Sequence, residues 1–239
     1  MTWSIIARDS VGNFGVAIAS RFFAVGALCV HVRRGVGALS TQALMNPLYG
    51  PAGIEALSRA QTPAQVVAEL TGADAGREQR QLHLLAAQGP GAAHTGANCV
   101  DWCGHLVETD FSVAGNMLTG ARVIEATAEA FLTAQGKPLA ERLLAALAAG
   151  DAAGGDKRGK QGAALCIQGD EDYRQLDLRV DDHSEPIIEL QRLYEVSLER
   201  FQPFLTCLAG RHDPVGIIDR PQIDARIADF QAARALRRS

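Results

Sequence analysis

The residue with the clearest potential for chemistry is Thr2, which directly follows the initiator Met. A small second residue favours removal of Met1, and the product then carries a free α-amine beside a hydroxyl. Such a hydroxyl can act as a nucleophile with the amine of the same residue as its base. The amine titrates near pH ~8, so part of it is unprotonated at neutral pH. Thr2 is therefore a candidate nucleophile; the alternative is that Thr is simply a common second residue.

Asn116 is the second candidate catalytic residue, because Gly115-Asn116 follows an apolar stretch. A side-chain amide and a backbone N–H at this place can stabilise the oxyanion that forms when a carbonyl is attacked. A tight turn with Asn at positive φ explains the same pair without chemistry. Both interpretations stay open from the sequence.

Seven further polar residues are candidates for substrate binding. An arginine can hold a carboxylate with two parallel hydrogen bonds, and the Gly-rich stretch AGGDKRGKQ offers a charged loop for such a contact. Each candidate also has a structural explanation as a polar strand end or a solvated turn. The seven are Arg21, Arg33, Thr41, Gln42, His94, Asp156 and Arg158.

Two groups of residues resemble metal ligands. The first has the types that zinc accepts, but its spacing departs from the common C-x2-C knuckle; it consists of His94, Cys99, Cys103 and His105. The second, Asp181-Asp182-His183, is acidic enough for Mg²⁺ or Ca²⁺. A helix cap by Asp182 or Ser184 explains the second group better, because the following Glu-Pro suits a first helical turn. We expect no metal and no cofactor.

Composition bounds the class of protein. The chain has 239 residues, of which 47% are hydrophobic and 21% charged, with a net charge of −4. These values predict a globular protein with enough material for a large core. The absence of a long basic run disfavours nucleic-acid binding, and no stretch approaches the ~20 apolar residues of a membrane span. We expect a cytoplasmic protein with free thiols, no membrane partner and a small-molecule substrate, and leave a homo-oligomer open.

The elements that must position these residues follow a block pattern rather than an alternating βαβ pattern. Strands are predicted over residues 2–7, 15–19, 27–32, 36–41, 81–87, 92–95, 163–167 and 176–180, with one or two more between 106 and 114. Helices are predicted over 52–59, 64–70, 121–133, 139–149, 185–194 and 222–236. The first four strands are expected to form a meander, and the blocks favour a layered α+β fold.

Several stretches, in this order, resemble one known family. They are TWSIIARD, GNFGVAIASRFFAVGA, GVGALSTQA, NPLYG, AAHTGANC, WCGH, GNML, AGGDKRGKQGAAL and LRVDDHSEPIIEL. On these motifs the chain resembles the family called domain of unknown function 1028, which is similar in fold to the N-terminal-nucleophile (Ntn) hydrolases. The resemblance implies a four-layer αββα sandwich, with Thr2 at the start of the first strand. We expect this domain over residues 1–205 and a helical tail over 206–239.

The resemblance implies no established reaction, and the sequence departs from the proteasome-like pattern. Those relatives place a carboxylate at the end of the second strand, where this chain has Ala19-Ser20-Arg21, and a lysine near the position of Arg33 and Arg34. The function predicted is that of an amidohydrolase acting on a small amide or peptide-like metabolite. The alternatives are a non-catalytic binding or oligomeric module on the same fold, or a metal-dependent hydrolase.

Overall fold

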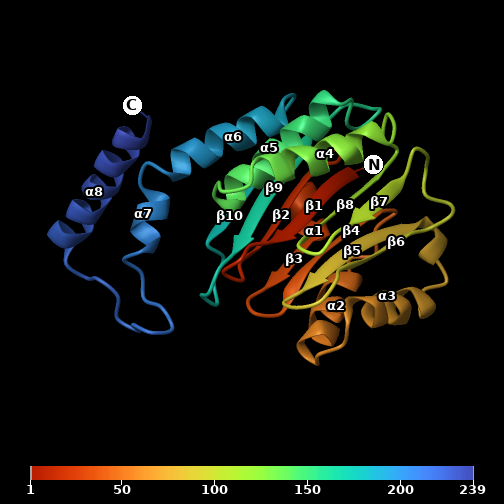
Figure 1. Cartoon of the computed structure of the whole chain (residues 1–239), viewed down its shortest axis with the longest axis horizontal. Helices are drawn as coiled ribbons and strands as arrows, with labels where there is room; N and C mark the ends of the chain where they lie inside the picture. The colour runs from red at the N-terminus through yellow and green to blue at the C-terminus, as the bar shows by residue number, and fades with distance from the viewer. Residues whose placement is uncertain (1, 239) are drawn as a thin grey trace.

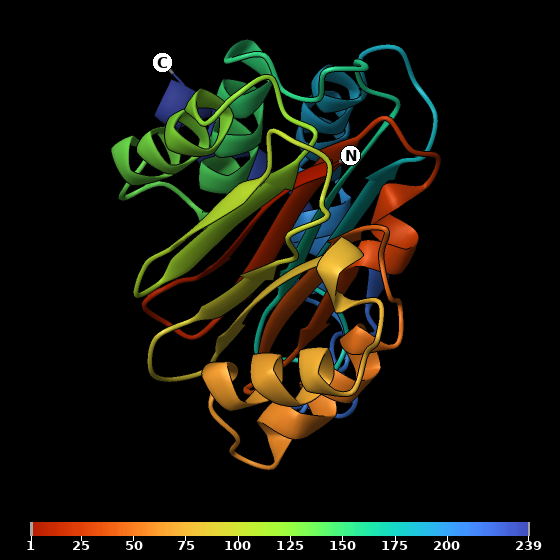
Figure 2. The same ribbon diagram turned by 90° about the vertical axis from the view of Figure 1, so that its right-hand side faces the viewer.

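The computed structural model describes residues 2–238, and their strands form two antiparallel sheets. The larger sheet has the strand order β10-β9-β2-β1-β8-β7 and the smaller has the order β3-β4-β5-β6. Figures 1 and 2 show the two sheets stacked face to face. The strands are β1 Thr2–Arg8, β2 Phe14–Ser20, β3 Val30–Arg33, β4 Gly37–Ala43, β5 Arg80–Ala86, β6 Ala92–Thr95, β7 Gly104–Val107, β8 Phe111–Asn116, β9 Gly162–Gln168 and β10 Leu176–Val180.

Helices cover the outer face of each sheet (Figure 2). Helices α4 Arg122–Thr133, α5 Leu139–Ala152 and α6 Pro186–Ser197 pack on the larger sheet through one apolar cluster. Helices α2 Tyr49–Ser58 and α3 Pro63–Gly72 pack on the smaller sheet through another. Because each sheet has one face on helices and one on the other sheet, the predicted α+β class and four-layer αββα sandwich are confirmed.

The predicted four-strand meander is wrong. β1 and β2 pair with each other in the larger sheet, whereas β3 and β4 belong to the smaller one. The first part of the predicted strand over residues 27–32 is instead the short helix α1, Val25–Cys29, which begins after Ala24 at φ 51°. The chain uses this helical turn to pass from one sheet to the other, so an apolar run that suits a strand is divided between two elements.

Side chains alternate along β1 between the face that packs on helices and the face that lies between the two sheets. Trp3 and Ile5 point towards helices α4–α6, whereas Thr2, Ser4 and Ile6 point between the sheets. Part of the inter-sheet layer is apolar and contains Ile6, Val16, Ile18, Ala38 and Leu85. The rest consists of buried polar side chains, which we call the polar inter-sheet cluster: Thr2, Ser4, Ser20, Ser40, Gln42, Gln81, His83, Ser112 and Asn116. The cluster therefore surrounds the start of β1.

Gly150 in α5 permits the close approach of Trp3. A Cβ at Gly150 would lie 2.4 Å from Oγ1 of Thr127 and 2.7 Å from Nε1 of Trp3. We expect Gly150→Ala to destabilise the fold by about 1–3 kcal/mol, although Ala is the better helix former. Gly72→Ala, at the end of α3, is the matched control because its Cβ meets nothing within 4 Å. Chemical denaturation checks both variants, and an unchanged Gly150→Ala midpoint would contradict this packing.

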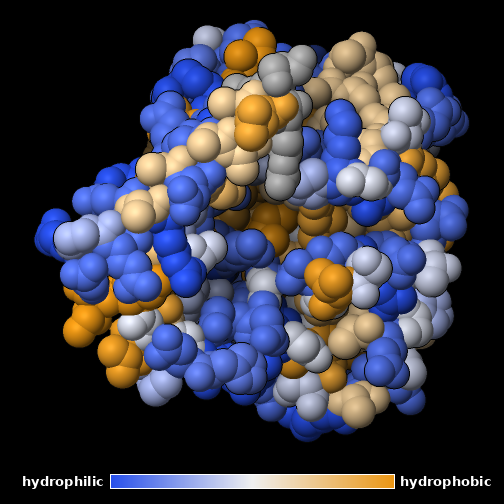
Figure 3. Space-filling view, turned by 60° about the vertical axis from the view of Figure 1, so that its left-hand side comes forward, coloured by the Kyte–Doolittle hydropathy of each residue, from blue (hydrophilic) through white to orange (hydrophobic). Residues whose placement is uncertain are grey.

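Helix α7 Phe201–Leu205 follows α6, and the stretch predicted as a helical tail, residues 206–239, contains α8 Arg220–Arg238 (Figure 1). Gln231 donates through Nε2 to the backbone carbonyls of Leu198 and Glu199, and Arg234 pairs with Glu195. Figure 3 shows a hollow with apolar residues at its floor on this side of the molecule. Among residues 2–238 no helix, α8 included, has the length and apolar character needed to cross a membrane.

Candidate functional site

Thr2 is the first residue of β1, an inner strand of the larger sheet with β2 on one side and β8 on the other. It pairs with Asn116 of β8, and its neighbour Trp3 pairs with Ala19, so that Thr2 stands opposite Ser20. The hydroxyl of Thr2 donates to Oγ of Ser20 at 3.1 Å. Thr2 is 5% exposed and Asn116 2% exposed. The hydroxyl nucleophile predicted from the sequence and the amide predicted to assist it are therefore neighbours in one sheet.

The smaller sheet contributes two amide side chains to the same place. Nε2 of Gln42 lies 3.5 Å from the main-chain oxygen of Thr2 and donates to Oε1 of Gln81 at 2.8 Å. The same Gln81 oxygen accepts from Nδ2 of Asn116 at 3.0 Å. Gln42 and Gln81 are both fully buried. Hydrogen bonds between the two sheets thus connect both predicted catalytic residues with Gln42.

A buried serine and histidine continue this network. Oγ of Ser4 donates to Oε1 of Gln42 at 2.7 Å and lies 2.8 Å from Nε2 of His83, whose Nδ1 lies 3.0 Å from Oγ of Ser112. Burial, with a smaller contribution from the nearby His105, lowers the pKa of His83 to about 3. His83 is consequently neutral at physiological pH, although its partners are those of a Ser-His pair.

The AGGDKRGKQ loop joins α5 to β9 and crosses the end of the larger sheet. Asp156 bridges to Leu118, just after β8, and the N–H of Gln161 donates to the carbonyl of Ser20 at 2.9 Å. The Asp156 carboxylate accepts from the backbone N–H groups of Arg21 and Arg158 at 3.1 and 2.8 Å. Its side chain is wholly buried, and the Arg158 guanidinium lies 3.4 Å away. Three predicted binding residues, Arg21, Asp156 and Arg158, therefore form one unit beside Thr2.

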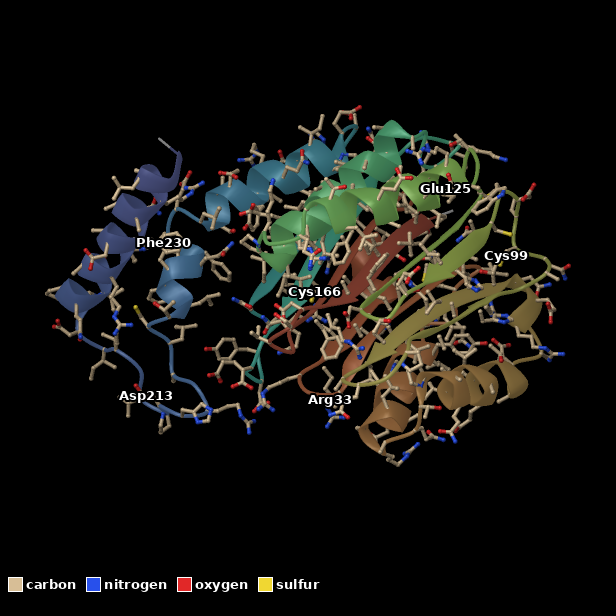
Figure 4. The ribbon with its side chains drawn as sticks, in the orientation of Figure 1. Arg33, Cys99, Glu125, Cys166, Asp213 and Phe230 are labelled. Atoms are coloured by element: carbon tan, nitrogen blue, oxygen red, sulfur yellow. The ribbon has the colours of Figure 1, made fainter. Side chains whose placement is uncertain are left out.

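The structure does not bring Arg33, Thr41 or His94 to Thr2. Arg33 pairs with Gly37, at the far end of β4 from Gln42, and its guanidinium lies 3.5 Å from Glu55. Cys99 marks the end of the smaller sheet where Gln42 lies, because its thiol bonds to the carbonyl of Arg80, which pairs with Ala43. Figure 4 shows Arg33 and Cys99 towards opposite ends of this sheet. A distance of five residues along β4 corresponds to about 16 Å.

Thr41 and His94 do not reach the surroundings of Thr2, because each lies one residue away from an inward-facing position in its strand. A step of one residue along a strand turns the side chain to the opposite face of the sheet. Thr41 follows the inward-facing Ser40 and bonds to the carbonyl of Asn46 at 3.2 Å. His94 pairs with Leu82 of the outer cluster and bonds to the carbonyl of Arg77 at 2.9 Å. The neighbour Thr95 is the residue that receives a hydrogen bond from Gln81, at 2.8 Å.

The residues that resemble metal ligands have other partners. His105 bonds to Thr95, while the thiols of Cys99 and Cys103 point at the backbone carbonyls of Arg80 and Cys99. Within residues 2–238, no three His, Cys, Asp or Glu side chains are gathered to hold an ion.

The predicted cap of α6 by Asp182 or Ser184 is also not observed. The cap residue is Glu185, whose N–H donates to Nδ1 of His183 at 2.9 Å. Asp182 instead accepts from Gln161, and its neighbour Asp181 pairs with Arg179. The bond between Gln161 and Asp182 attaches the segment before α6 to the loop beside Thr2.

Six members of the polar inter-sheet cluster were not candidates from the sequence: Ser4, Ser20, Ser40, Gln81, His83 and Ser112. The signal that would have found them is alternation. Within or directly after predicted strands, these polar residues occupy every second position opposite an apolar face, as Gln81 and His83 do beside Leu82 and Leu84. Two such strands facing each other predict a polar layer between sheets.

A four-layer α+β sandwich with a polar cluster at the start of its first strand defines the class of this protein. The model described as "Family of unknown function (DUF1028)" matches residues 2–190, and the chain belongs to that family. The crystal structure of protein SPO2555 from Silicibacter pomeroyi, assigned to the same family, is 30% identical with a TM-score of 0.84 and covers 92% of this chain and 96% of that one.

Two other comparisons, with a second solved structure and with curated proteins, give no further information on function. Anbu, the ancestral beta-subunit from Yersinia bercovieri, is 15% identical with a TM-score of 0.40, and covers 82% of this chain and 94% of that one, a likeness too weak to carry an argument. No curated protein matches the chain.

Proposed function

We propose that this protein is an N-terminal-nucleophile amidohydrolase that acts on a small amide or peptide-like metabolite after removal of Met1. The observation that carries the proposal is the position of Thr2: a hydroxyl residue at the start of β1, inside a buried polar cluster, with Asn116 beside it. A buried polar layer costs stability unless every group is hydrogen-bonded. Here the polar groups around Thr2 are hydrogen-bonded to one another, and they would supply the donors and acceptors that this reaction needs.

The chemistry follows from the groups around Thr2. Oγ of Thr2 attacks the substrate carbonyl, and its proton passes to the free amine of the same residue. Nδ2 of Asn116, together with a backbone N–H, stabilises the oxyanion. The protonated amine then gives its proton to the leaving amine as the C–N bond breaks. Water attacks the acyl ester on Thr2, with the amine again as base, and releases the acid.

The loop beside the site supports a preference for substrates with a carboxylate. Arg21 and Arg158 are anchored through their backbone N–H groups to the buried Asp156 carboxylate. The side chain of Arg158 is 44% exposed, so it can turn towards a ligand while its backbone stays fixed. A guanidinium held in this way matches the two oxygens of a carboxylate.

An electrophilic β-lactone tests the proposal without knowledge of the substrate. Its carbonyl acylates an activated hydroxyl, so we expect one adduct per chain, found by peptide mapping on the peptide that begins with Thr2. An adduct on another residue, or no adduct under conditions that label an Ntn hydrolase, would contradict the proposal.

Asn116→Ala is expected to slow acylation of Thr2 by about 10²–10³-fold, because one oxyanion donor is lost. The matched control is Asn13→Ala in the turn between β1 and β2, at the far end of β1. Stopped-time mass spectrometry with the same lactone measures both rates. Equal rates for the two variants would remove Asn116 from the catalytic groups.

One observation favours a second function, that of a non-catalytic binding module on the same fold. Ser20 occupies the end of β2, where proteasome-like relatives have a carboxylate, and Thr2 is only 5% exposed. Thermal shifts produced by small amides or carboxylates, without any adduct on Thr2 and without turnover, would support this module over the enzyme.

A further inference from the structure

Gln81 is the residue at which the hydrogen bonds of the polar inter-sheet cluster converge. Its oxygen accepts from Gln42 and Asn116. Its nitrogen has two protons and faces three acceptors, the carbonyls of Gly104 and Gly115 at 3.0 and 2.8 Å and Oγ1 of Thr95 at 2.8 Å. It belongs to β5 of the smaller sheet, whereas Asn116 and both glycines belong to strands of the larger one. Gln81 therefore spans the space between the sheets and is buried completely.

The direction of these bonds is determined by the backbone. A carbonyl only accepts, so the Gln81 nitrogen faces Gly104 and Gly115 and the Gln81 oxygen faces the other way. This oxygen accepts only, so both Asn116 and Gln42 must turn their amide nitrogens towards it. The amide orientations, which are ambiguous for an isolated side chain, are fixed here in one consistent way.

The remaining partners agree with this direction. With its nitrogen on Gln81, Gln42 presents its oxygen to Ser4, whose single hydroxyl proton is donated there. Ser4 can then accept from Nε2–H of His83. The Nδ1 of His83 lies 3.0 Å from Oγ of Ser112, whose single proton also faces the carbonyl of Leu106 at 3.0 Å. The hydrogen-bond directions are therefore consistent from Ser4 through Gln42 and Gln81 to Asn116.

We propose that Gln81 is a positioning residue, which holds the amide nitrogen of Asn116 beside Thr2 in the orientation that an oxyanion requires. The inference rests on the proposed function for its catalytic meaning. One N–H of Asn116 is bonded to Gln81, and its second N–H is the donor for the substrate oxygen. Without Gln81 the Asn116 amide is free to turn, and its oxygen would repel the developing negative charge.

Gln81→Met tests this role because Met keeps the length of the side chain and removes both hydrogen-bonding atoms. We expect the maximal acylation rate of Thr2 by the β-lactone to fall by about 10²-fold, with little change in the lactone concentration at half-maximal rate. In the Asn116→Ala background the same substitution is expected to change the rate by no more than about 2-fold. Gln88→Met, in the exposed turn after β5, is the matched control.

The double-mutant comparison separates positioning from general loss of structure. An equal fall in rate in both backgrounds would overturn the proposal, since Gln81 would then act independently of Asn116.

A measurement without the lactone keeps this inference distinct from the proposed function. In ¹⁵N-labelled protein, one side-chain proton of Asn116 is expected to exchange slowly with solvent and to lose this protection in Gln81→Met. Unchanged protection would overturn the positioning role whatever the lactone does. Normal protection together with an unlabelled Thr2 would refute the nucleophile while the Gln81–Asn116 contact stands.

Discussion

Thr2→Ala is expected to abolish labelling and turnover, with a fall in rate of at least ~10⁴-fold. Removal of the nucleophile from a covalent mechanism leaves only binding and oxyanion stabilisation. Ala is also small, so Met1 is still removed and the free amine is retained. Thr2→Ser keeps both the amine and a hydroxyl and should react at a rate comparable with that of the original protein. Progress curves of adduct formation measure all three proteins.

The fold should tolerate these substitutions. The side-chain contact that Thr2→Ala removes is one neutral hydrogen bond, to Ser20, and such a bond contributes about 1 kcal/mol. A modest fall in melting temperature with complete loss of labelling is the expected combination. Retention of labelling or turnover by Thr2→Ala would refute the mechanism, because no part of it works without the Thr2 hydroxyl.

Acid is expected to destabilise the fold through His83. Burial lowers the pKa of His83 from 6.5 to about 3, so between these values the unfolded chain binds a proton that the folded chain refuses. Stability from the neutral His83 is therefore fully present above pH 6.5 and is lost as the pH falls towards about 3. At about pH 4 the loss is on the order of 3 kcal/mol, at ~1.4 kcal/mol per pH unit.

His83→Gln isolates this contribution from that of the carboxylates, which titrate in both proteins. The variant is expected to be less stable than the original at neutral pH, because the bonds to Ser4 and Ser112 are disturbed. The difference should narrow by about 3 kcal/mol between pH 7 and about pH 4 in urea titrations. His212→Gln is the control, because the side chain of His212 is 86% exposed. Parallel pH profiles for His83→Gln and the original would contradict the buried neutral histidine.

Local sequence signals predicted most elements of this fold. Thr62-Pro63 marks the start of a helix, and α3 begins there with a capping box between Thr62 and Gln65. The aromatic and β-branched residues of TWSIIA predict β1 with its ends correct to about one residue. The division of residues 27–32 between α1 and β3 was not predictable, because the reason is the distance between two sheets that the chain must cross.

The site was predictable only in part, because register decides which residues meet. Asn116 and Gln42 lie beside Thr2, as expected, because each ends a strand at the correct edge of its sheet. Arg33 suits the chemistry equally well but belongs to the opposite end of β4. His94 and Thr95 differ by one position, and only the strand pairing with Gln81 shows which of them faces inward.

The proposed reaction requires Thr2 to become the N-terminal residue, and the intact mass of the untagged protein tests this requirement most directly. We predict a mass lower by one methionine residue than that of the full 239-residue chain, with an unmodified amine at Thr2 in N-terminal sequencing. Complete retention of Met1, or a blocked amine on Thr2, would contradict the account, because the base of the proposed reaction would be missing.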